Sequence, residues 1–309
     1  MARATRTTAA TATATGTGTA TGTTAGVHRF QDTPRTTRTT LARTAAAAGA
    51  VALLVAGLGA CGASAGDDEE PERKSFALQG RTLTVDSDDS ALEIVAADAH
   101  PRGTIVVTRW FEGSVVLGKD PDVTWSMKDD RLVLRLECSG FVADCSAKHR
   151  IEVPRGVTVN VRDGDGSVRA RGFRDPLDIR TGDGSVRVSD STGPMELRTG
   201  DGSIRVSGAT GPLRMRTGDG SIRADVSSRD VRTHTGDGSV RLELGVVPDR
   251  VESRSGDGSV TIGLPRATYR VTTETGDGGV DVSVPRDPSS AHVVSARTGD
   301  GKVTVRTAN

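Results

Sequence analysis

The chain has 309 residues, including 38 glycines and 12 prolines, and its aromatic content is only 3 %. Its 40 basic and 40 acidic residues cancel overall, but residues 1–60 hold six arginines and one acid, Asp32, so the remainder carries a net charge of −5. This negative charge argues against nucleic acid as a partner, and the few aromatic residues argue against a core with room for large rings.

Residues 1–60 have the features of an export signal. Three arginines (Arg35, Arg38 and Arg43) precede an apolar stretch, residues 45–60, that is too short for a stable membrane span. The stretch leads into Leu-Gly-Ala-Cys61, which resembles a bacterial lipobox. By that resemblance Cys61 becomes the first mature residue and carries a diacylglyceryl group on its sulfur atom. The alternative is an ordinary secretory signal with an incidental cysteine.

The leader is long for such a signal, and residues 1–26 are low in complexity. Val27 is therefore an alternative translation start. Residues 61–75 are small, acidic and free of apolar periodicity, and we expect them to form a flexible tether.

Residues 76–155 show strand patterning without the repeat described below, and we expect them to cap the N-terminal end of the repeat region. Cys138 and Cys145 flank a short excursion between two of these strands. Because an exported chain meets an oxidising compartment, we expect a disulfide between them.

The tripeptide Gly-Asp-Gly recurs eight times in residues 156–309. Its central residues are Asp165, Asp183, Asp201, Asp219, Asp237, Asp257, Asp277 and Asp300. The first five are 18 residues apart, and the later steps are 20, 20 and 23. A fixed period with one turn signal predicts an all-β solenoid, a stack of coils of about 18 residues, rather than a globular domain with a pocket.

Apolar and polar residues alternate on both sides of each triplet, so each period reads as strand, tight turn, strand. Equivalent apolar positions would form two columns in sequence order. One column runs from Val159 through Leu177 to Val251 and Val271, and the other from Val168 through Val186 to Val260, Val280 and Val303. A hairpin meander is the alternative, but it does not explain so constant a period.

We expect the two glycines of each triplet to supply positive φ beside the aspartate. Stacked aspartates would repel one another, so interleaved ladders of aspartate and arginine are the expected remedy. The arginines before the turns are Arg180, Arg198, Arg216, Arg254 and Arg297. Those after the turns are Arg169, Arg187, Arg205, Arg223 and Arg241, and this second row is a candidate anion-binding ladder.

The repeated Thr-Gly-Asp-Gly-Ser-Val/Ile elements and the Val153-Pro154 step into the first coil resemble the bacterial putative-adhesin β-strand repeat family, domain of unknown function 4097. The excess of 35 arginines over 5 lysines is typical of GC-rich actinobacteria. The resemblance implies a β-solenoid on an exported protein, with a role in surface adhesion or envelope-stress sensing and no catalytic residues.

Three sharper hypotheses compete with this interpretation. A calcium-binding β-roll would need acidic turns on both sides of each coil, and the opposite turns lack a repeating carboxylate. Binding of ice through a threonine column (Thr181, Thr199, Thr217, Thr235, Thr275 and Thr298) is disfavoured because strand parity places these residues on the core side. An enzyme is disfavoured because the histidines are scattered singly and no nucleophile motif occurs.

We therefore predict a non-catalytic, lipid-anchored surface module that binds an envelope polymer or a surface protein, without a cofactor or metal. The alternative is a signalling partner that senses envelope stress. The sequence leaves the ligand and the oligomeric state open.

Overall fold

The computed structural model describes residues 70–98, 103–140 and 143–308, all of which belong to the compact unit Gly59–Asn309. These residues form 23 strands and no helix. None of them therefore lies in a helix that is long and apolar enough to span a membrane. The predicted all-β class is confirmed.

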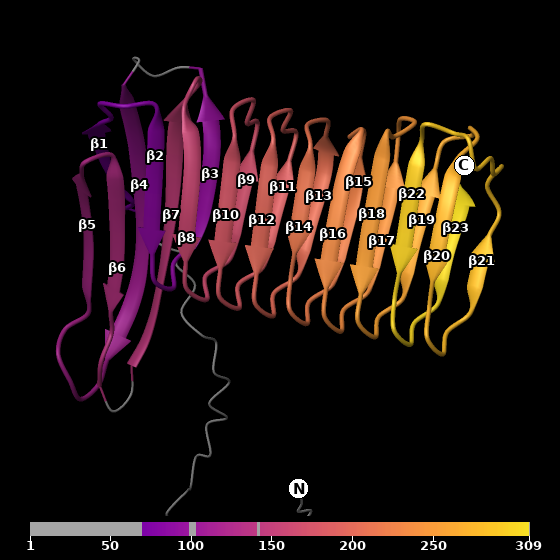
Figure 1. Ribbon diagram of the computed structural model, residues 1–309. Coiled ribbons are helices and arrows are strands. Elements are labelled where there is room, and N and C mark those ends of the chain that lie inside the picture. Colours follow the sequence, from indigo (N-terminus) through magenta and orange to yellow (C-terminus); the bar gives the residue numbers. More distant parts are fainter. Residues whose placement is uncertain (1–69, 99–102, 141–142, 309) are drawn as a thin grey trace, which may run out of the picture. The chain divides into compact units, whose positions relative to one another are not determined.

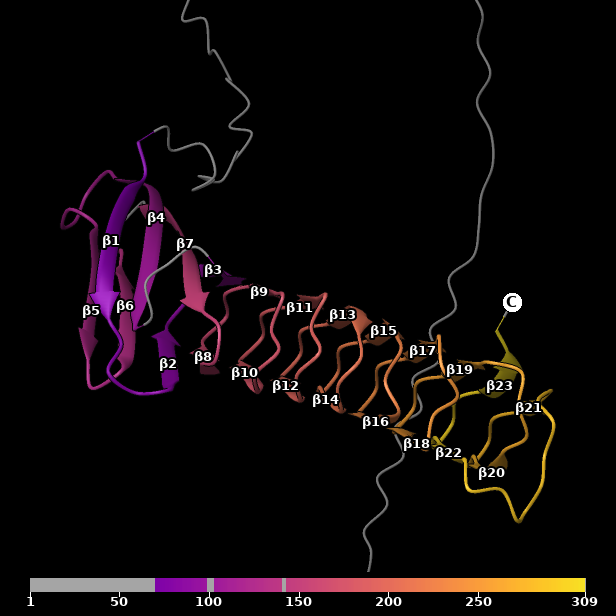
Figure 2. The same cartoon turned by 90° about the horizontal axis from the view of Figure 1, so that it is seen from above.

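The strands form two sheets, which appear in Figure 2 as two facing rows and in Figure 1 as successive arrows. The 12 strands of sheet 1 lie in the order β1 (Glu72–Ala77), β4 (Thr104–Val115), β7 (Ala143–Pro154), β3 (Ala91–Ala97), β9 (Val168–Arg171), β11 (Val186–Ser189), β13 (Ile204–Ala209), β15 (Ile222–Val226), β17 (Val240–Leu244), β19 (Val260–Leu264), β23 (Val303–Thr307) and β21 (Val280–Val282). The 11 strands of sheet 2 lie in the order β20 (Arg270–Glu274), β22 (Val293–Arg297), β18 (Arg250–Ser255), β16 (Asp230–Thr235), β14 (Leu213–Arg216), β12 (Met195–Thr199), β10 (Leu177–Thr181), β8 (Thr158–Asp163), β2 (Thr82–Ser87), β6 (Arg131–Glu137) and β5 (Asp122–Lys128).

Each repeat contributes one strand to each sheet, and the Gly-Asp-Gly turn joins the two strands. Equivalent strands of successive repeats pair in parallel: Leu177 of β10 lies between Val159 and Met195. Strands of a hairpin meander would pair antiparallel. The structure is therefore the predicted solenoid and not a meander.

The predicted apolar columns form the core between the sheets. Val159, Leu177 and Met195 of sheet 2 are at most 3 % exposed, and Val168 and Val186 of sheet 1 are at most 1 % exposed. Burying each such side chain stabilises the fold by roughly 1.5–3 kcal/mol relative to leaving it in water. No single coil could bury both of its faces, so the stack is the stable unit.

The turn glycines are needed for close stacking and not for positive φ. The described glycines with positive φ are Gly103, Gly156, Gly172 and Gly208, and none of them belongs to a Gly-Asp-Gly turn. A Cβ added at Gly202 would lie 2.1 Å from the carbonyl oxygen of Gly184 in the preceding coil. The prediction of positive φ beside the turn aspartates is therefore wrong. Backbone touches backbone at each turn, which leaves no room for a side chain.

A column of hydroxyl groups joins the turns to their neighbouring coils through hydrogen bonds. The Thr199 hydroxyl donates to the carbonyl oxygens of Gly182 and Gly184, at 3.0 and 2.9 Å, and accepts a hydrogen bond from the amide of Gly202. Thr181, Thr217, Thr235, Ser255, Thr275 and Thr298 bond in the same way to the glycines of the coil that they stack on. The threonine column thus lies on the core side, as the strand parity predicted.

The last two coils are stacked in the reverse of their sequence order. Val251 pairs with Val294 rather than with Val271, and Val260 pairs with Val303 rather than with Val280. The predicted columns are therefore wrong at this end. The β22–β23 coil directs Val294, Ala296, Val303 and Val305 into the core, and all four are 0 % exposed. This coil is therefore suited to lie between two other coils. The β20–β21 coil is more polar and ends the stack, with Val280 48 % exposed.

At the other end, β2 and β3 form a coil without a Gly-Asp-Gly triplet. β2 pairs in parallel with β8, and β3 pairs in parallel with β9. The antiparallel pairs β4–β7 and β5–β6 follow, with β1 on β4, and they cover the open edges of this first coil. A disulfide joins Cys138 and Cys145 at the ends of the excursion between β6 and β7.

Candidate anion-binding surfaces

One row of arginines crosses the outer face of sheet 1. β9, β11, β13, β15 and β17 each contribute one member: Arg169, Arg187, Arg205, Arg223 and Arg241. Each is the direct register neighbour of the next, at the roughly 4.8 Å spacing of paired strands. All five are exposed because the residues on either side of them in each strand point into the core. The structure thus brings together the ladder named from the sequence.

Most of this ladder has no ion pair, although Asp225 stands two residues after Arg223 on the same face. Arg241 forms an ion pair with Glu243 at 3.2 Å. Within the described residues, the other four arginines have neither an ion pair nor a side-chain hydrogen bond. The carboxylate that continues the row beyond Arg169 is Glu93, and it already holds Arg150 at 3.3 Å. Four adjacent guanidinium groups are therefore available to a ligand.

A shallow hollow of about 180 Å³ follows this ladder. Its polar lining alternates between the serines that follow the turns, Ser167, Ser185 and Ser203, and the arginines Arg169, Arg187 and Arg205. Guanidinium groups only donate hydrogen bonds, and serine hydroxyls can do so. The arrangement offers the same donor set at every coil, which suits an acceptor group that also repeats.

The turn aspartates do not form the expected ladders with arginine. In the described part of the chain, no ion pair involves any of the eight. Instead, the Oδ1 atom of Asp165 accepts a hydrogen bond from the amide of Asp183 at 3.2 Å. No group of three or more His, Cys, Asp or Glu side chains among the described residues is placed to hold a metal ion.

Three of the five arginines before the turns find partners within their own strands. Arg180 pairs with Asp178 at 2.8 Å, Arg254 pairs with Glu252 at 2.5 Å, and Arg198 pairs with Glu196. Residues two apart in a strand point to the same side, so the acidic side chain lies beside the arginine on the same face of the sheet. Arg297 instead pairs with Glu274 of the neighbouring strand at 3.2 Å. The interleaved Asp/Arg ladders are therefore a wrong prediction.

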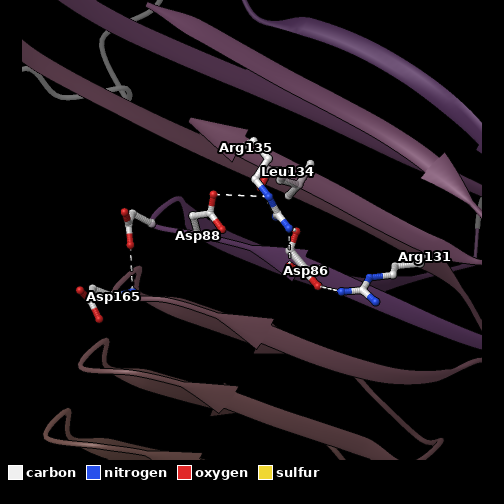
Figure 3. Close-up of polar contacts among 7 residues, drawn as sticks. Asp86, Asp88, Arg131, Leu134, Arg135 and Asp165 are labelled. Atoms are coloured by element: carbon white, nitrogen blue, oxygen red, sulfur yellow. Dashed lines mark hydrogen bonds and ion pairs between the residues drawn. The ribbon is translucent and has the colours of Figure 1, made fainter. Parts of the chain in front are cut away.

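Ion pairs also join the first coil to β6, as Figure 3 shows. Arg131 and Arg135 both contact the carboxylate of Asp86, and Arg135 reaches Asp88 at 3.4 Å. Burial alone would raise the pKa of Asp86, but these two arginines lower it below its usual value. The acidic turn of the first coil is thus neutralised on the side that faces β6.

Asp163 stands where later coils have threonine or serine. It is the register neighbour of Ser87 and Thr181, is 8 % exposed, and has no hydrogen-bond partner for either carboxylate oxygen among the described residues. Burial raises its pKa to about 7, and the carboxylates of Asp89, Asp165 and Asp88 add to the increase, while the adjacent Ser87 acts in the opposite direction.

His149 of β7 is a second buried titratable group. It is 0 % exposed, and neither ring nitrogen has a hydrogen-bond partner within the described ranges. Its ring lies 6.5 Å from that of Trp125, measured between centroids. Burial, and secondarily the charge of Arg109, lowers its pKa to about 4. This histidine packs as a neutral core residue, away from the arginine ladder.

Two features were not predicted from the sequence, although both are visible there as departures from the repeat. Asp163 breaks the hydroxyl column, and Arg214 breaks a column that is acidic at Asp178, Glu196 and Glu252. Cys61, His100 and the leader lie outside the described residues, so the lipid anchor stays a prediction.

Comparison with known proteins finds one family. Residues 138–283 match the model of the family described as Toastrack DUF4097. This segment includes the strands from β7 to β21, whereas the β2–β3 and β22–β23 coils lie outside it. No curated protein matches the chain.

Three solved structures are similar at low identity. A putative adhesin from Parabacteroides merdae is 12 % identical, covering 77 % of this chain and 96 % of its own, with a TM-score of 0.48. A putative adhesin from Parabacteroides distasonis is 12 % identical, covering 78 % and 98 %, with a TM-score of 0.48. A putative cell adhesion protein from Clostridium sporogenes is 11 % identical, covering 77 % and 100 %, with a TM-score of 0.26.

Proposed function

We propose that this chain, whose residues 138–283 match the model of the Toastrack DUF4097 family, is a non-catalytic binding module of the cell surface that recognises an anionic envelope polymer. The observation that carries the proposal is the row of four adjacent arginines, Arg169, Arg187, Arg205 and Arg223, which have no ion-pair partner in the described part of the chain. On sheet 2, by contrast, the arginines that stand two residues after an acid in the same strand are paired with it: Arg180, Arg198, Arg232 and Arg254.

A linear polymer fits this row better than a single small ion. Each strand adds one guanidinium group at the strand spacing of about 4.8 Å, so the donors form a single file. Like charges so arranged repel one another, and a chain with one phosphate or carboxylate group in each repeating unit would relieve the repulsion along the whole row. Its units would each meet one arginine and one serine of the hollow.

The test is binding of phosphate and uronate polymers by the mature chain, from residue 61 onward, carrying Cys61→Ser so that it stays soluble. The double variant Arg187→Gln/Arg205→Gln removes two central donors and should weaken binding of the preferred polymer about tenfold or more, which is 1.4 kcal/mol or more. Isothermal titration or a pull-down on immobilised polymer measures the effect.

The matched control is Arg180→Gln/Arg198→Gln, which removes two arginines of sheet 2 that are held by Asp178 and Glu196. This variant carries the same net charge as the first and should bind polymer nearly as well as the wild type. Equal losses in the two variants would show that only the overall charge matters, and would contradict a specific ladder.

Export and anchoring complete the proposal, and they rest on the leader and on Cys61. Replacing Cys61 with serine should release the protein from the membrane fraction into the medium, because a thioether-linked lipid would no longer form. Detergent partitioning and mass spectrometry of the mature N-terminus measure this. Unchanged partitioning of the Cys61→Ser chain would refute lipidation at this residue.

A further inference from the structure

A hollow of about 300 Å³ lies on the outer face of sheet 2, on the opposite side of the solenoid from the ladder. It lies over β12, β14, β16 and β18, and six of its lining residues are basic: Arg198, Arg214, Arg216, Arg232, His234 and Arg254. Only Glu196 and Glu252 among its lining residues are acidic. The hollow therefore carries an excess of positive charge.

The excess arises in β14 and β16, where the acid-arginine pattern of β10, β12 and β18 is broken. In β10, β12 and β18 an acid stands two residues before the arginine and pairs with it. In β14 that position is Arg214, so Arg214 and Arg216 lie on the same face with no carboxylate between them. Within the described residues neither arginine has an ion pair or a side-chain hydrogen bond.

The acids nearest to these two arginines are already engaged. Arg214 lies beside Glu196 of β12, but Glu196 holds Arg198. On the other side Arg214 lies beside Arg232 of β16, which is itself paired with Asp230 at 3.4 Å. The other arginines that line the hollow, Arg198, Arg232 and Arg254, thus each pair with an acid of their own strand, whereas the two cations of β14 remain uncompensated.

Arg216 and Arg214 form a two-by-two block with the facing residues of β16, His234 and Arg232. His234 replaces an arginine of the column, and its shorter side chain leaves room in the block. Burial lowers the pKa of His234, and the charges of Arg216 and Arg254 lower it further. The pKa of the imidazole is therefore sensitive to the positive potential in the hollow, and an anion bound there would raise this pKa.

We propose that this hollow is a second binding site for a compact phosphate dianion, which Arg214, Arg216 and His234 bind together. A block of donors suits one group that carries two charges and several acceptor oxygens. It differs in this respect from the single file of sheet 1, which suits a polymer. The site does not depend on the ladder, since the two rows lie on different sheets.

The test follows the Hε1 resonance of His234 by NMR across pH, in the mature chain with Cys61→Ser. Inorganic phosphate and glucose 6-phosphate are the two probes, and sodium chloride at equal ionic strength is the reference. We expect either phosphate to raise the pKa of His234 by about one unit beyond the effect of chloride, as an opposite charge in contact does. Stronger binding of glucose 6-phosphate would identify the monoester as the natural group, and stronger binding of inorganic phosphate would identify the free ion.

Arg214→Gln/Arg216→Gln should weaken phosphate binding at least about tenfold. The same variant should raise the pKa of His234 in the free protein, because the cation at Arg216 is lost, which also shows that the sheet is intact. The control Arg187→Gln/Arg205→Gln on sheet 1 should leave the phosphate response unchanged while losing polymer binding. The proposal is overturned if phosphate acts on His234 no more than chloride does, or if the β14 variant keeps the wild-type affinity.

Discussion

Replacing Asp163 with threonine is expected to stabilise the protein strongly at pH 8 and hardly at all at pH 4. Folding raises the pKa of this carboxyl from 3.8 to about 7, so between these values the folded state binds more protons than the unfolded chain. Its contribution is therefore complete below pH 3.8 and is lost as the pH rises through 7. The difference between pKa values of 3.8 and about 7 corresponds to roughly 4 kcal/mol, which the variant should recover above pH 7.

Threonine is chosen because it is the residue of this column in the following coils. The Thr181 hydroxyl donates to the carbonyl oxygen of Gly164 at 2.7 Å, and a hydroxyl at position 163 would face the equivalent carbonyls of Asp88 and Ser90. A carboxylate cannot donate to these carbonyl oxygens, whereas a protonated carboxyl or a threonine can. Urea unfolding at the two pH values measures the difference.

His149 gives the opposite pH dependence across nearly the same window. Its pKa falls from 6.5 to about 4 on folding, so the stability it allows is complete above pH 6.5 and is lost as the pH falls toward 4. The two groups therefore offset each other in the wild type, whose stability should change little between pH 4 and 7. In Asp163→Thr the effect of His149 is no longer offset by Asp163, and stability should rise with pH.

The matched control is Asp201→Asn, in which an exposed aspartate of another turn loses its charge. It should not reproduce the stabilisation that Asp163→Thr gives at pH 8. If Asp163→Thr shifted stability equally at pH 4 and pH 8, the carboxyl would not titrate in the buried corner as described.

Replacing Gly220 with alanine is expected to destabilise the stack by about 3 kcal/mol or more, at the upper end of the range for overpacking. The added Cβ would lie 2.1 Å from the carbonyl oxygen and 2.5 Å from the carbonyl carbon of Gly202. Both contacts are with backbone, which cannot move without separating two coils. The loss should appear as a lower midpoint of thermal or urea unfolding.

Two other glycines make this prediction specific. A Cβ at Gly218 would lie 2.8 Å from the nearest carbonyl oxygen, so Gly218→Ala should be milder than Gly220→Ala. A Cβ at Gly279 would have no atom within 4 Å, so Gly279→Ala should be close to neutral. Equal stability of the Gly220 and Gly279 variants would contradict backbone contact as the reason for the second glycine of the triplet.

The solenoid could be predicted from the sequence because its period, its alternation and its turns agree from Asp165 to Asp257. The parity of the strands also placed Thr199 correctly on the core side. The role of the glycines could not be settled in this way, since Gly-Asp-Gly suits either positive φ or a close approach of two backbones. Only the position of the preceding coil distinguishes the two.

The reversed order of the last two coils could not be predicted from the sequence either. Val271 and Val294 occupy equivalent positions in the repeat, and both could pair with Val251. The order is decided by how many apolar residues each coil directs inward along both strands, which is a property of the whole coil. The prediction of the ion pairs was wrong for a related reason. Arg180 has two acids near it in sequence, and it pairs with Asp178, two residues before it, rather than with the turn aspartate.

The salt dependence of polymer binding tests the proposed function most directly. The affinity of the mature chain for polyphosphate and for polygalacturonate would be measured over a range of sodium chloride concentrations, for the wild type and for Arg187→Gln/Arg205→Gln. We predict that the logarithm of the affinity falls linearly with the logarithm of salt concentration, and that the slope becomes shallower by roughly one unit for each arginine removed from contact. The same slope in both proteins, or binding that the two ladder substitutions leave unchanged, would contradict a polymer lying along this row.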